Sequence, residues 1–330
     1  MDNILLDIRH LTTSFTLFAQ SAASRFNTFN AVDNVDLTLR EQEILGIVGE
    51  SGGGKSVTGF SILRLIDPPG RIADGEILYR GSDILKKTEV EMQKVRGREI
   101  AMIFQDPMTA LNPLHTVGRQ IDEMLRIHTT LGSRERRERV ISLLEEVGIH
   151  DAKERMSSYP HQFSGGMLQR VVIATALAAR PRLIIADEPT TALDVTVQAQ
   201  ILHLILESVK NHGAALILIT HDLAVVAGMT ERVAVMYCGK IVEEGSTDDV
   251  IRSPLHPYTQ GLINSIPHPT PGQENSKRLP QIPGMVPSLT SLPVGCSFAP
   301  RCSYAKERCL SEKPALRSVG GRKVACWIGG

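Results

Sequence analysis

The amino-acid sequence has few aromatic residues and no excess of charge of either sign. Phe, Trp and Tyr make up 4% of the 330 residues, and 36 basic residues balance 36 acidic ones. A basic excess is the main electrostatic sign of nucleic-acid binding, and aromatic side chains supply the platforms on which bases stack. The composition therefore argues against a nucleic-acid-binding protein, and no nucleic-acid partner is expected.

Long hydrophobic runs are also lacking. A membrane-spanning helix needs about 20 apolar residues, and the longest apolar stretch, Val171 to Ala179, is about half that length. The acidic start, Met1-Asp2-Asn3, leads to no signal-peptide pattern. Hydrophobic residues make up 42% of the chain, enough for a full core. We expect a soluble cytoplasmic protein of about two domains, able to dock on a membrane protein.

Short apolar runs alternate with helical patterns along much of the chain. The runs that predict buried strands are Ile44–Val48, Ile100–Phe104, Leu183–Ala186 and Leu216–Ile219. Between the last two, apolar residues recur at helical spacing from Ile201 to Val209, after Asp194. The repeated order of strand, helix and strand predicts an α/β fold with a parallel sheet and helices on both faces.

Two stretches depart from this pattern. No strand-like run occurs from about Leu111 to Gln162, which predicts an inserted helical subdomain over about 108–180. Eight of the 18 prolines fall between Pro267 and Pro300, a density that prevents regular helix and sheet. We therefore predict a main domain over 1–252 and an irregular, proline-rich C-terminal extension over 253–330.

The clearest motif is a glycine-rich loop between a predicted strand and a predicted helix. Its residues fit G-x-x-x-x-G-K-[ST] and are Gly49, Glu50, Ser51, Gly52, Gly53, Gly54, Lys55 and Ser56. Glycines let backbone N–H groups curl around phosphate oxygens, and the following helix points its positive end at them. Lys55 would place a charge on the β and γ phosphates, and Ser56 would offer a hydroxyl to Mg²⁺. A glycine-rich turn that binds nothing is the alternative.

Two carboxylates, Asp187 and Glu188, end the predicted strand Leu183–Ala186. Ligands of α/β sheets bind at the carboxyl ends of the strands. Asp187 would hold Mg²⁺ through water, and Glu188 could act as the general base that polarises an attacking water. Taken alone the pair fits a solvated acidic turn equally well, but the phosphate loop favours the catalytic interpretation.

A second anion site is predicted where Ser164-Gly165-Gly166 opens a helix-like segment that runs to Arg180. A serine and two glycines at a helix N-terminus suit an anion. One nucleotide does not need two such sites in one subunit, so we expect this site to cap a nucleotide held by a partner.

These motifs together resemble the ABC ATPase family, and the resemblance covers nearly the whole chain. The segment Phe163-Ser164-Gly165-Gly166-Met167 is similar to the family's signature, usually L-S-G-G-Q, with Phe163 replacing leucine and Met167 replacing glutamine. The resemblance implies a P-loop ABC ATPase nucleotide-binding domain that hydrolyses ATP with Mg²⁺.

The resemblance also implies further site residues. Gln105 matches the Q-loop, as a catalytic residue and Mg²⁺ ligand, and His221 matches the switch histidine that contacts the γ-phosphate. Asp194, in Ala192-Leu193-Asp194, matches the D-loop. Phe15 stands where the family places an aromatic against adenine, with core packing as the alternative. Glu188, His221 and Gln105 are thus the implied catalytic residues.

Three segments are similar to peptide-importer ATPases in particular. They are the Q-loop at 104–113, the segment His256-Pro257-Tyr258-Thr259 and the tail from Gly295-Cys296 to Cys326. The resemblance implies a translocase subunit that energises import of di- or oligopeptides. The implied partners are a second ABC ATPase subunit, identical or paralogous, two membrane permeases and, indirectly, an extracytoplasmic binding protein. The chain would be peripheral, on the cytoplasmic face of a prokaryotic plasma membrane.

Other functions stay open from the sequence. A soluble ABC ATPase of translation or DNA repair would use the same ATP site, although such proteins usually carry two cassettes or a long coiled-coil insertion. In an exporter ATPase the Q-loop and tail features would be unexpected. Related importers move nickel, glutathione and other small solutes, and no residue identifies the cargo.

Four of the five cysteines lie in the last 35 residues, with the spacing C-x5-C-x6-C-x16-C. They are Cys296, Cys302, Cys309 and Cys326. Four thiolates can hold Zn²⁺ or a [4Fe–4S] cluster. The absence of closer C-x2-4-C pairs and the resemblance favour iron–sulfur, with Zn²⁺, unligated cysteines and disulfides as alternatives. We interpret Cys238 as a small buried hydrophobe beside the predicted strand Val233–Met236.

Overall fold

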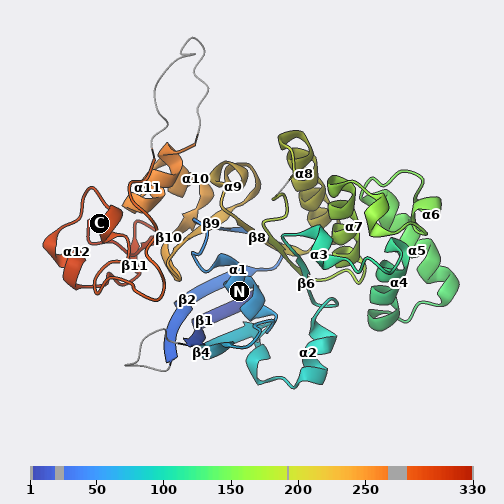
Figure 1. The fold of residues 1–330 in the computed structure, drawn as a ribbon, viewed down its shortest axis with the longest axis horizontal. Helices are drawn as coiled ribbons and strands as arrows, with labels where there is room; N and C mark the ends of the chain where they lie inside the picture. Colours follow the sequence, from blue (N-terminus) through green and yellow to red (C-terminus); the bar gives the residue numbers. More distant parts are fainter. Residues whose placement is uncertain (1–2, 19–25, 192, 267–280, 329–330) are drawn as a thin grey trace, which may run out of the picture. The chain divides into compact units, whose positions relative to one another are not determined.

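The chain forms two compact units, which we describe one at a time. The computed structural model describes residues 3–18, 26–191, 193–266 and 281–328. Unit 1 contains the described residues of Met1–Ile4, Leu39–Glu43 and Lys86–Leu218, and unit 2 contains those of Leu5–Thr38, Ile44–Leu85 and Ile219–Gly330. Each unit is therefore assembled from segments far apart in the sequence, and its elements can be located in Figure 1.

Unit 1 combines a pair of parallel strands with a set of helices. Strand β6 (Ile100–Ile103) runs parallel to β7 (Leu183–Asp187), with Ile103 opposite Ala186. Both strands are buried along their whole length, which explains their continuous apolar sequence. The helices are α2 (Glu89–Val95), α3 (Pro107–Ala110), α4 (Val117–His128), α5 (Ser133–Glu146), α6 (Ala152–Arg155), α7 (Gly165–Leu177) and α8 (Val195–His212), with a short 3-10 turn at Pro160–Gln162.

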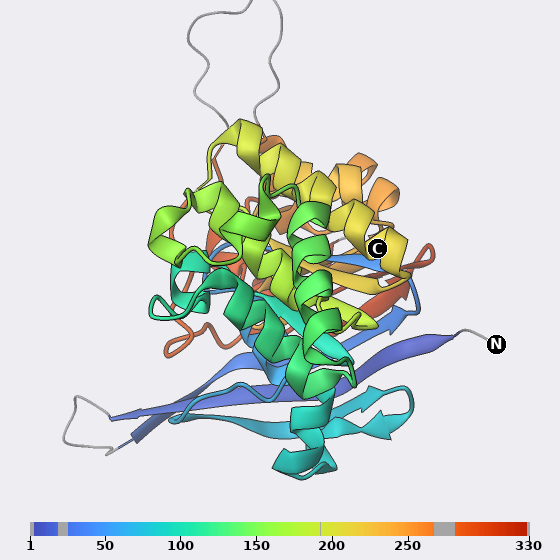
Figure 2. The same cartoon turned by 90° about the vertical axis from the view of Figure 1, so that its right-hand side faces the viewer.

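Helices α4, α5 and α7 pack against one another, as the green ribbons of Figure 2 show. Their buried faces carry Ile121 and Leu125 of α4 and Leu144 of α5, at helical spacing. Thr116 caps the first turn of α4, where its hydroxyl accepts the N–H of Arg119. The helices predicted for this part of the chain are thus present, while the subdomain boundary at about 108–180 remains a prediction.

Unit 2 contains a four-stranded sheet that the sequence patterns did not predict, in which β4 is antiparallel to both β1 and β5. The strand order is β2-β1-β4-β5, and β1 pairs with β4 from Leu6 opposite Tyr79 to Phe15 opposite Gly70. The strands are β1 (Ile4–Phe18), β2 (Phe26–Arg40), β4 (Gly70–Tyr79) and β5 (Ser82–Asp83).

A second set of strands in unit 2 is built on β3 (Ile44–Val48), which runs parallel to β9 (Arg232–Tyr237). Antiparallel pairing then continues from β9 to β10 (Lys240–Ser246), β12 (Arg322–Val324) and β11 (Arg317–Val319). Strand β8 (Ala215–Thr220) begins in unit 1 and ends in unit 2. The helices of unit 2 are α1 (Lys55–Ile62), α9 (Leu223–Met229), α10 (Thr247–Arg252), α11 (Pro257–Asn264) and α12 (Glu307–Ser311), with short 3-10 turns at Ile84–Lys86 and Ala299–Arg301.

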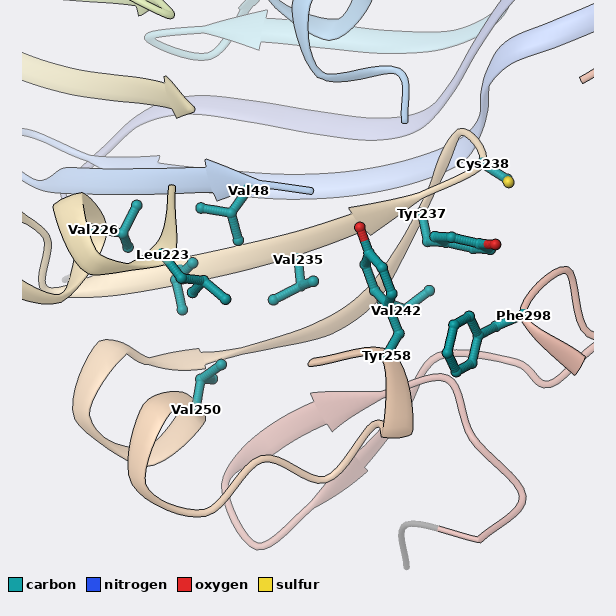
Figure 3. Packing of buried hydrophobic residues seen from close by; sticks show 11 residues of the cluster. Val48, Leu223, Val226, Val235, Tyr237, Cys238, Val242, Val250, Tyr258 and Phe298 are labelled. Carbon is teal, nitrogen blue, oxygen red and sulfur yellow. The ribbon is translucent and has the colours of Figure 1, made fainter. Parts of the chain in front are cut away.

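The C-terminal residues of unit 2 are held by ordinary packing. Phe298 is buried against Tyr237 and Tyr258, with both pairs of ring centroids 5.4 Å apart (Figure 3). The fully buried carboxylate of Glu243 accepts the backbone N–H groups of Leu255 and of His256, at 2.8 and 2.9 Å. Aromatic packing, the β11–β12 hairpin and these hydrogen bonds therefore order the described part of the tail.

None of the helices in the described part of the chain is both long enough and apolar enough to cross a lipid bilayer. The predicted boundary at residue 253 is not decided by the two units, because unit 2 contains residues on both sides of it. Residues 267–280 of the predicted proline-rich extension lie outside the described residues.

Candidate functional site

The phosphate loop of unit 2 follows a path that only glycine permits at key positions. A Cβ on Gly49 would lie 2.1 Å from the carbonyl oxygen of Met236, and one on Gly54 would lie 2.3 Å from that of Ala31. Gly54 also has a φ of 96°, in the left-handed region that favours glycine. Because the crowding atoms are backbone, side-chain adjustment could not relieve the clashes. The glycine pattern read from the sequence therefore has a steric cause in this loop.

Lys55, the first residue of α1, folds back over the loop. Its side chain is almost fully buried, and Nζ donates to the carbonyl oxygens of Gly49 at 2.8 Å and of Glu50 at 3.1 Å. Carbonyl oxygens compensate a buried ammonium for lost hydration. Ser56 follows, half-buried, in the first turn of the same helix. The cation and the hydroxyl that the motif requires are thus fixed at the loop.

Glu50, inside the loop, contacts Tyr258 and Arg301, two residues whose part in this loop the sequence did not indicate. Its backbone N–H donates to the Tyr258 hydroxyl at 2.7 Å. Its carboxylate accepts two hydrogen bonds from Arg301, at 2.6 and 3.0 Å. Arg301 and Tyr258 lie more than 200 positions further along the chain, so sequence spacing gave no signal for these contacts.

The two carboxylates that end β7 in unit 1 have different surroundings. Asp187 is almost fully buried, whereas Glu188 is half-buried and has a positive φ of 42°. Such backbone conformations are uncommon outside glycine and cluster at functional sites. Gln105, beyond the end of β6, donates from Nε2 to Oε2 of Glu188 at 3.4 Å, and the Thr191 hydroxyl donates to the same oxygen at 3.0 Å. Two donors thus orient one carboxylate oxygen, as a general base requires.

The signature-like segment and Asp194 also adjoin each other in unit 1. Ser164 is the N-cap of α7, where its exposed hydroxyl accepts the N–H of Met167 at 3.4 Å. A Cβ on Gly166 would lie 2.8 Å from a methyl group of Val197 in α8, so this contact between α7 and α8 requires glycine. Asp194 caps α8 by accepting the N–H of Val197 at 3.0 Å.

Gly165 lies beside Leu193, which precedes Asp194. A Cβ on Gly165 would lie 3.7 Å from the Leu193 side chain. Ser164 and Gly165 are exposed, as a surface that meets another molecule must be. Ala192, the first residue of the predicted D-loop, lies outside the described residues.

The remaining predicted site residues lie in unit 2. His221 follows β8 with an exposed side chain, just before Asp222, which caps α9 by accepting the N–H of Ala224. Phe15, on β1, is half-buried and stacks on Phe29 with ring centroids 6.0 Å apart. Phe29 thus covers one face of the Phe15 ring. A contact between Phe15 and adenine stays a prediction.

The four tail cysteines correct the prediction of an iron–sulfur protein. Cys309 and Cys326 are buried, Cys296 and Cys302 are half-buried, and all four line one small cavity. Nevertheless, no three Cys, His, Asp or Glu side chains among the described residues are placed to hold a metal ion. Burial raises the pKa of the Cys296 and Cys302 thiols, which disfavours the thiolate that a metal binds.

Neither the [4Fe–4S] cluster nor the Zn²⁺ alternative is therefore supported. The spacing and the resemblance pointed to a metal, whereas Phe298, Arg301 and the β11–β12 hairpin order the described tail through contacts of their own. Cys238 is buried at the end of β9, as interpreted from the sequence, and burial raises its pKa to about 11.

Comparison with known proteins places the motifs in a family context. Residues 32–191 match the family model described as "ABC transporter", and residues 242–309 match "Oligopeptide/dipeptide transporter, C-terminal region". The chain is 48% identical over 322 residues to the dipeptide transport ATP-binding protein DppD of Haemophilus influenzae, covering 98% of this chain and 94% of that protein. It is 49% identical over 299 residues to DppD of Escherichia coli, covering 90% of each chain.

Solved structures agree with these sequence relatives. The chain is similar to the ATP-binding cassette MJ0796, solved as a dimer in a post-hydrolysis state bound to ADP and Pi, with a TM-score of 0.63 and 28% identity over 73% of this chain and 98% of that one. It is also similar to cbiO1 of Clostridium perfringens, part of the ABC transporter complex cbiONQ, with a TM-score of 0.62 and 25% identity over 77% of this chain and 92% of that one. The α/β fold class predicted from the sequence is confirmed.

Proposed function

The chain belongs to the ABC transporter family of ATPases, and on that premise we propose that it energises the import of di- or oligopeptides through a membrane. The observation that carries the proposal is the identity of 48–49% with dipeptide transport ATP-binding proteins along 90–98% of the chain. The match of residues 242–309 to the C-terminal region of oligopeptide and dipeptide transporters adds support. An ATPase of translation or DNA repair has no comparable support.

We assign nucleotide binding to Phe15 and to the loop from Gly49 to Ser56. The buried Lys55 supplies positive charge at the loop, and the glycines keep open a backbone path that a Cβ would block. Mg²⁺, which would be held by Ser56, Gln105 and Asp187, neutralises phosphate charge when it is bound. Asp187 is the last residue of the buried strand β7, and ligands of α/β sheets bind at the carboxyl ends of the strands.

We assign the general base to Glu188. Its carboxylate would accept a proton from the attacking water, while Gln105 and Thr191 keep one of its oxygens oriented. His221, exposed after β8, would donate a hydrogen bond toward the γ-phosphate and position the water. Both roles rest on the order of the motifs, and that of Glu188 rests also on its contacts with Gln105 and Thr191.

We propose that two ATPase subunits hold two ATP molecules head to tail. Ser164, Gly165 and Gly166 of one chain would complete the site of the other, and Asp194 would support that face through α8. The exposure of Ser164 and Gly165 suits this role. ATP would favour the closed pair because it contacts both chains there, and hydrolysis would release it, a population shift driven by differential affinity.

The proposed assembly also contains two permeases, an identical or paralogous second ATPase and, indirectly, an extracytoplasmic binding protein. The chain would lie on the cytoplasmic face of a prokaryotic plasma membrane as a peripheral subunit. Within it, residues 1–252 would form the ATPase domain, about 108–180 the helical subdomain that transmits motion, and 253–330 the extension.

Co-purification tests this assembly. The chain, tagged at one end, is expressed with the genes that neighbour its own, and detergent-solubilised membranes are passed over an affinity column. We expect two permeases and a second ATPase subunit to elute with it. Recovery with ribosomes or DNA, and not with permeases, would contradict the proposal.

A further inference from the structure

The C-terminal extension reaches the phosphate loop through one side chain. Arg301 donates from both terminal nitrogens to the Glu50 carboxylate, at 2.6 and 3.0 Å. It also donates from Nε to the carbonyl oxygen of Pro283 at 3.0 Å and from one terminal nitrogen to the Tyr237 hydroxyl at 3.3 Å. Only 4% of the Arg301 side chain is exposed, so the guanidinium has exchanged water for these partners.

The ion pair matters because of where Glu50 stands. Glu50 is the second residue of a loop built to receive polyphosphate, and an unpaired carboxylate there would repel the ligand. The two-pronged contact with Arg301 neutralises the carboxylate and fixes its direction. Hydrogen bonding to Glu50 in turn raises the pKa of Arg301, so the guanidinium stays charged.

A second contact holds the backbone of the same residue. The Tyr258 hydroxyl accepts the Glu50 N–H, and the Tyr258 ring packs on Tyr237 and on Phe298 of the extension (Figure 3). Tyr258 therefore restrains the main chain of Glu50, while Arg301 of the extension restrains its side chain.

We propose that the C-terminal extension positions the phosphate loop through Arg301, so that docking of the extension and nucleotide binding favour each other. The inference rests on the proposed function, because it requires the loop to bind ATP. Arg301 is a positioning residue, because it would act through Glu50, whose negative charge it pairs and thereby keeps from opposing the nucleotide phosphates. Coupling of two binding events is reciprocal, so nucleotide should also stabilise the docked extension.

A double-mutant cycle on the purified full chain tests this inference. Arg301→Gln, Glu50→Gln and the double variant are compared with the wild type for affinity toward a fluorescent ADP. We expect Arg301→Gln to weaken binding roughly tenfold, within the range of coupled sites. In the Glu50→Gln background the same change should have little effect, because no charge remains to be neutralised. Additive effects, or unchanged affinity in folded Arg301→Gln, would overturn the inference.

Arg308→Gln is the matched control. Arg308 lies in the same extension, but among the described residues it pairs with Glu312 and covers the Trp327 ring. It should bind ADP as the wild type does. If wild type and control both fail to bind, the proposed function falls with the inference; if both bind and Arg301→Gln binds equally well, only the inference falls.

The rate of Cys302 alkylation provides a second test, which can be made even if the Arg301→Gln variant does not fold. The half-buried thiol should react more slowly with N-ethylmaleimide when ATP is bound, because ATP stabilises the docked extension. Glu50→Gln substitutes no residue of the extension, removes the charge that Arg301 pairs with, and should remove this protection. Equal protection in wild type and Glu50→Gln would contradict the coupling.

Discussion

Gln105 donates a hydrogen bond from Nε2 to Oε2 of Glu188, across the ends of the parallel strands β6 and β7. The contact is long, at 3.4 Å, and a second donor, the Thr191 hydroxyl, reaches the same oxygen at 3.0 Å. These two hydrogen bonds orient the carboxylate of Glu188. We propose that this oriented carboxylate accepts the proton from the attacking water.

Replacing Glu188 with Gln should nearly stop ATP hydrolysis while leaving nucleotide binding intact. The amide has almost the same shape but cannot accept a proton, and general-base catalysis is commonly worth roughly 100- to 10,000-fold in rate. Phosphate release by the assembled transporter measures the loss, and ATP should trap the closed dimer in gel filtration. Glu207→Gln, on the exposed face of α8, serves as the control. Undiminished turnover in Glu188→Gln would exclude Glu188 as the base.

Replacing Lys55 with Ala should weaken nucleotide binding itself. The change removes the buried charge at the loop and its hydrogen bonds to Gly49 and Glu50, and a charge-assisted contact is worth about 1.5–3 kcal/mol. We therefore expect a loss of affinity of roughly 10- to 100-fold, measured by fluorescent-nucleotide titration. Lys210→Ala, in the last turn of α8, should bind normally. Equal affinities in the two variants would place the phosphates elsewhere.

Ser164→Arg should leave ATP binding by the isolated monomer intact yet abolish hydrolysis at the site that this chain completes in its partner. Mixed dimers carrying the change in one chain report the effect. Ser164 also caps α7, and loss of a cap costs about 1 kcal/mol. Ser164→Ala loses the cap without adding bulk, so it separates helix destabilisation from steric blocking. If monomeric Ser164→Arg no longer bound ATP, the residue would serve its own nucleotide and the head-to-tail arrangement would be wrong.

His256 should make the fold less stable in mild acid. Burial lowers its pKa from 6.5 to about 4, while its ring nitrogen accepts the N–H of Tyr258 at 3.0 Å. Between these two pKa values the unfolded chain binds a proton that the folded chain does not. Stability is therefore complete above about pH 6.5 and is lost progressively as the pH falls toward 4, by about 3 kcal/mol from this residue.

Urea unfolding at several pH values between about 7 and 4 measures this loss. His256→Asn keeps a side-chain acceptor for the cap of α11 but cannot titrate, so its stability should fall less steeply with acid than that of the wild type. His203→Asn, on the exposed face of α8, should retain the wild-type slope. Parallel curves for wild type and His256→Asn would show that His256 does not contribute.

The motifs were readable from the sequence because each of them consists of consecutive residues. The phosphate loop needs glycine where a Cβ would clash with the carbonyl oxygens of Met236 and Ala31. The glycines that meet this need lie close together in one short segment of the sequence. The buried strands β3, β6, β7 and β8 appear as short apolar runs because both of their faces are covered. The helix α8 begins where Asp194 supplies a cap.

Contacts between residues far apart in the chain could not be predicted from the sequence. The antiparallel sheet of β1, β2 and β4 escaped prediction because its strands are partly exposed and mix polar with apolar residues. Nothing in the spacing of Glu50, Tyr258 and Arg301 indicates that they meet. The cysteine pattern misled for the same reason. Spacing and resemblance suggested a metal site, but none is present among the described residues. The tail is ordered by the packing of Phe298 and by the pairing of β12 with β10, which depend on the fold.

Peptide-dependent ATP hydrolysis would show whether the chain energises peptide import. The chain is reconstituted in liposomes with its permeases and second ATPase, and phosphate release is followed with the binding protein outside, either empty or loaded. We expect binding protein loaded with a di- or oligopeptide to accelerate hydrolysis and labelled peptide to accumulate inside. Glu188→Gln should abolish both. Hydrolysis indifferent to peptide, or accelerated by nickel or glutathione and not by peptide, would contradict it.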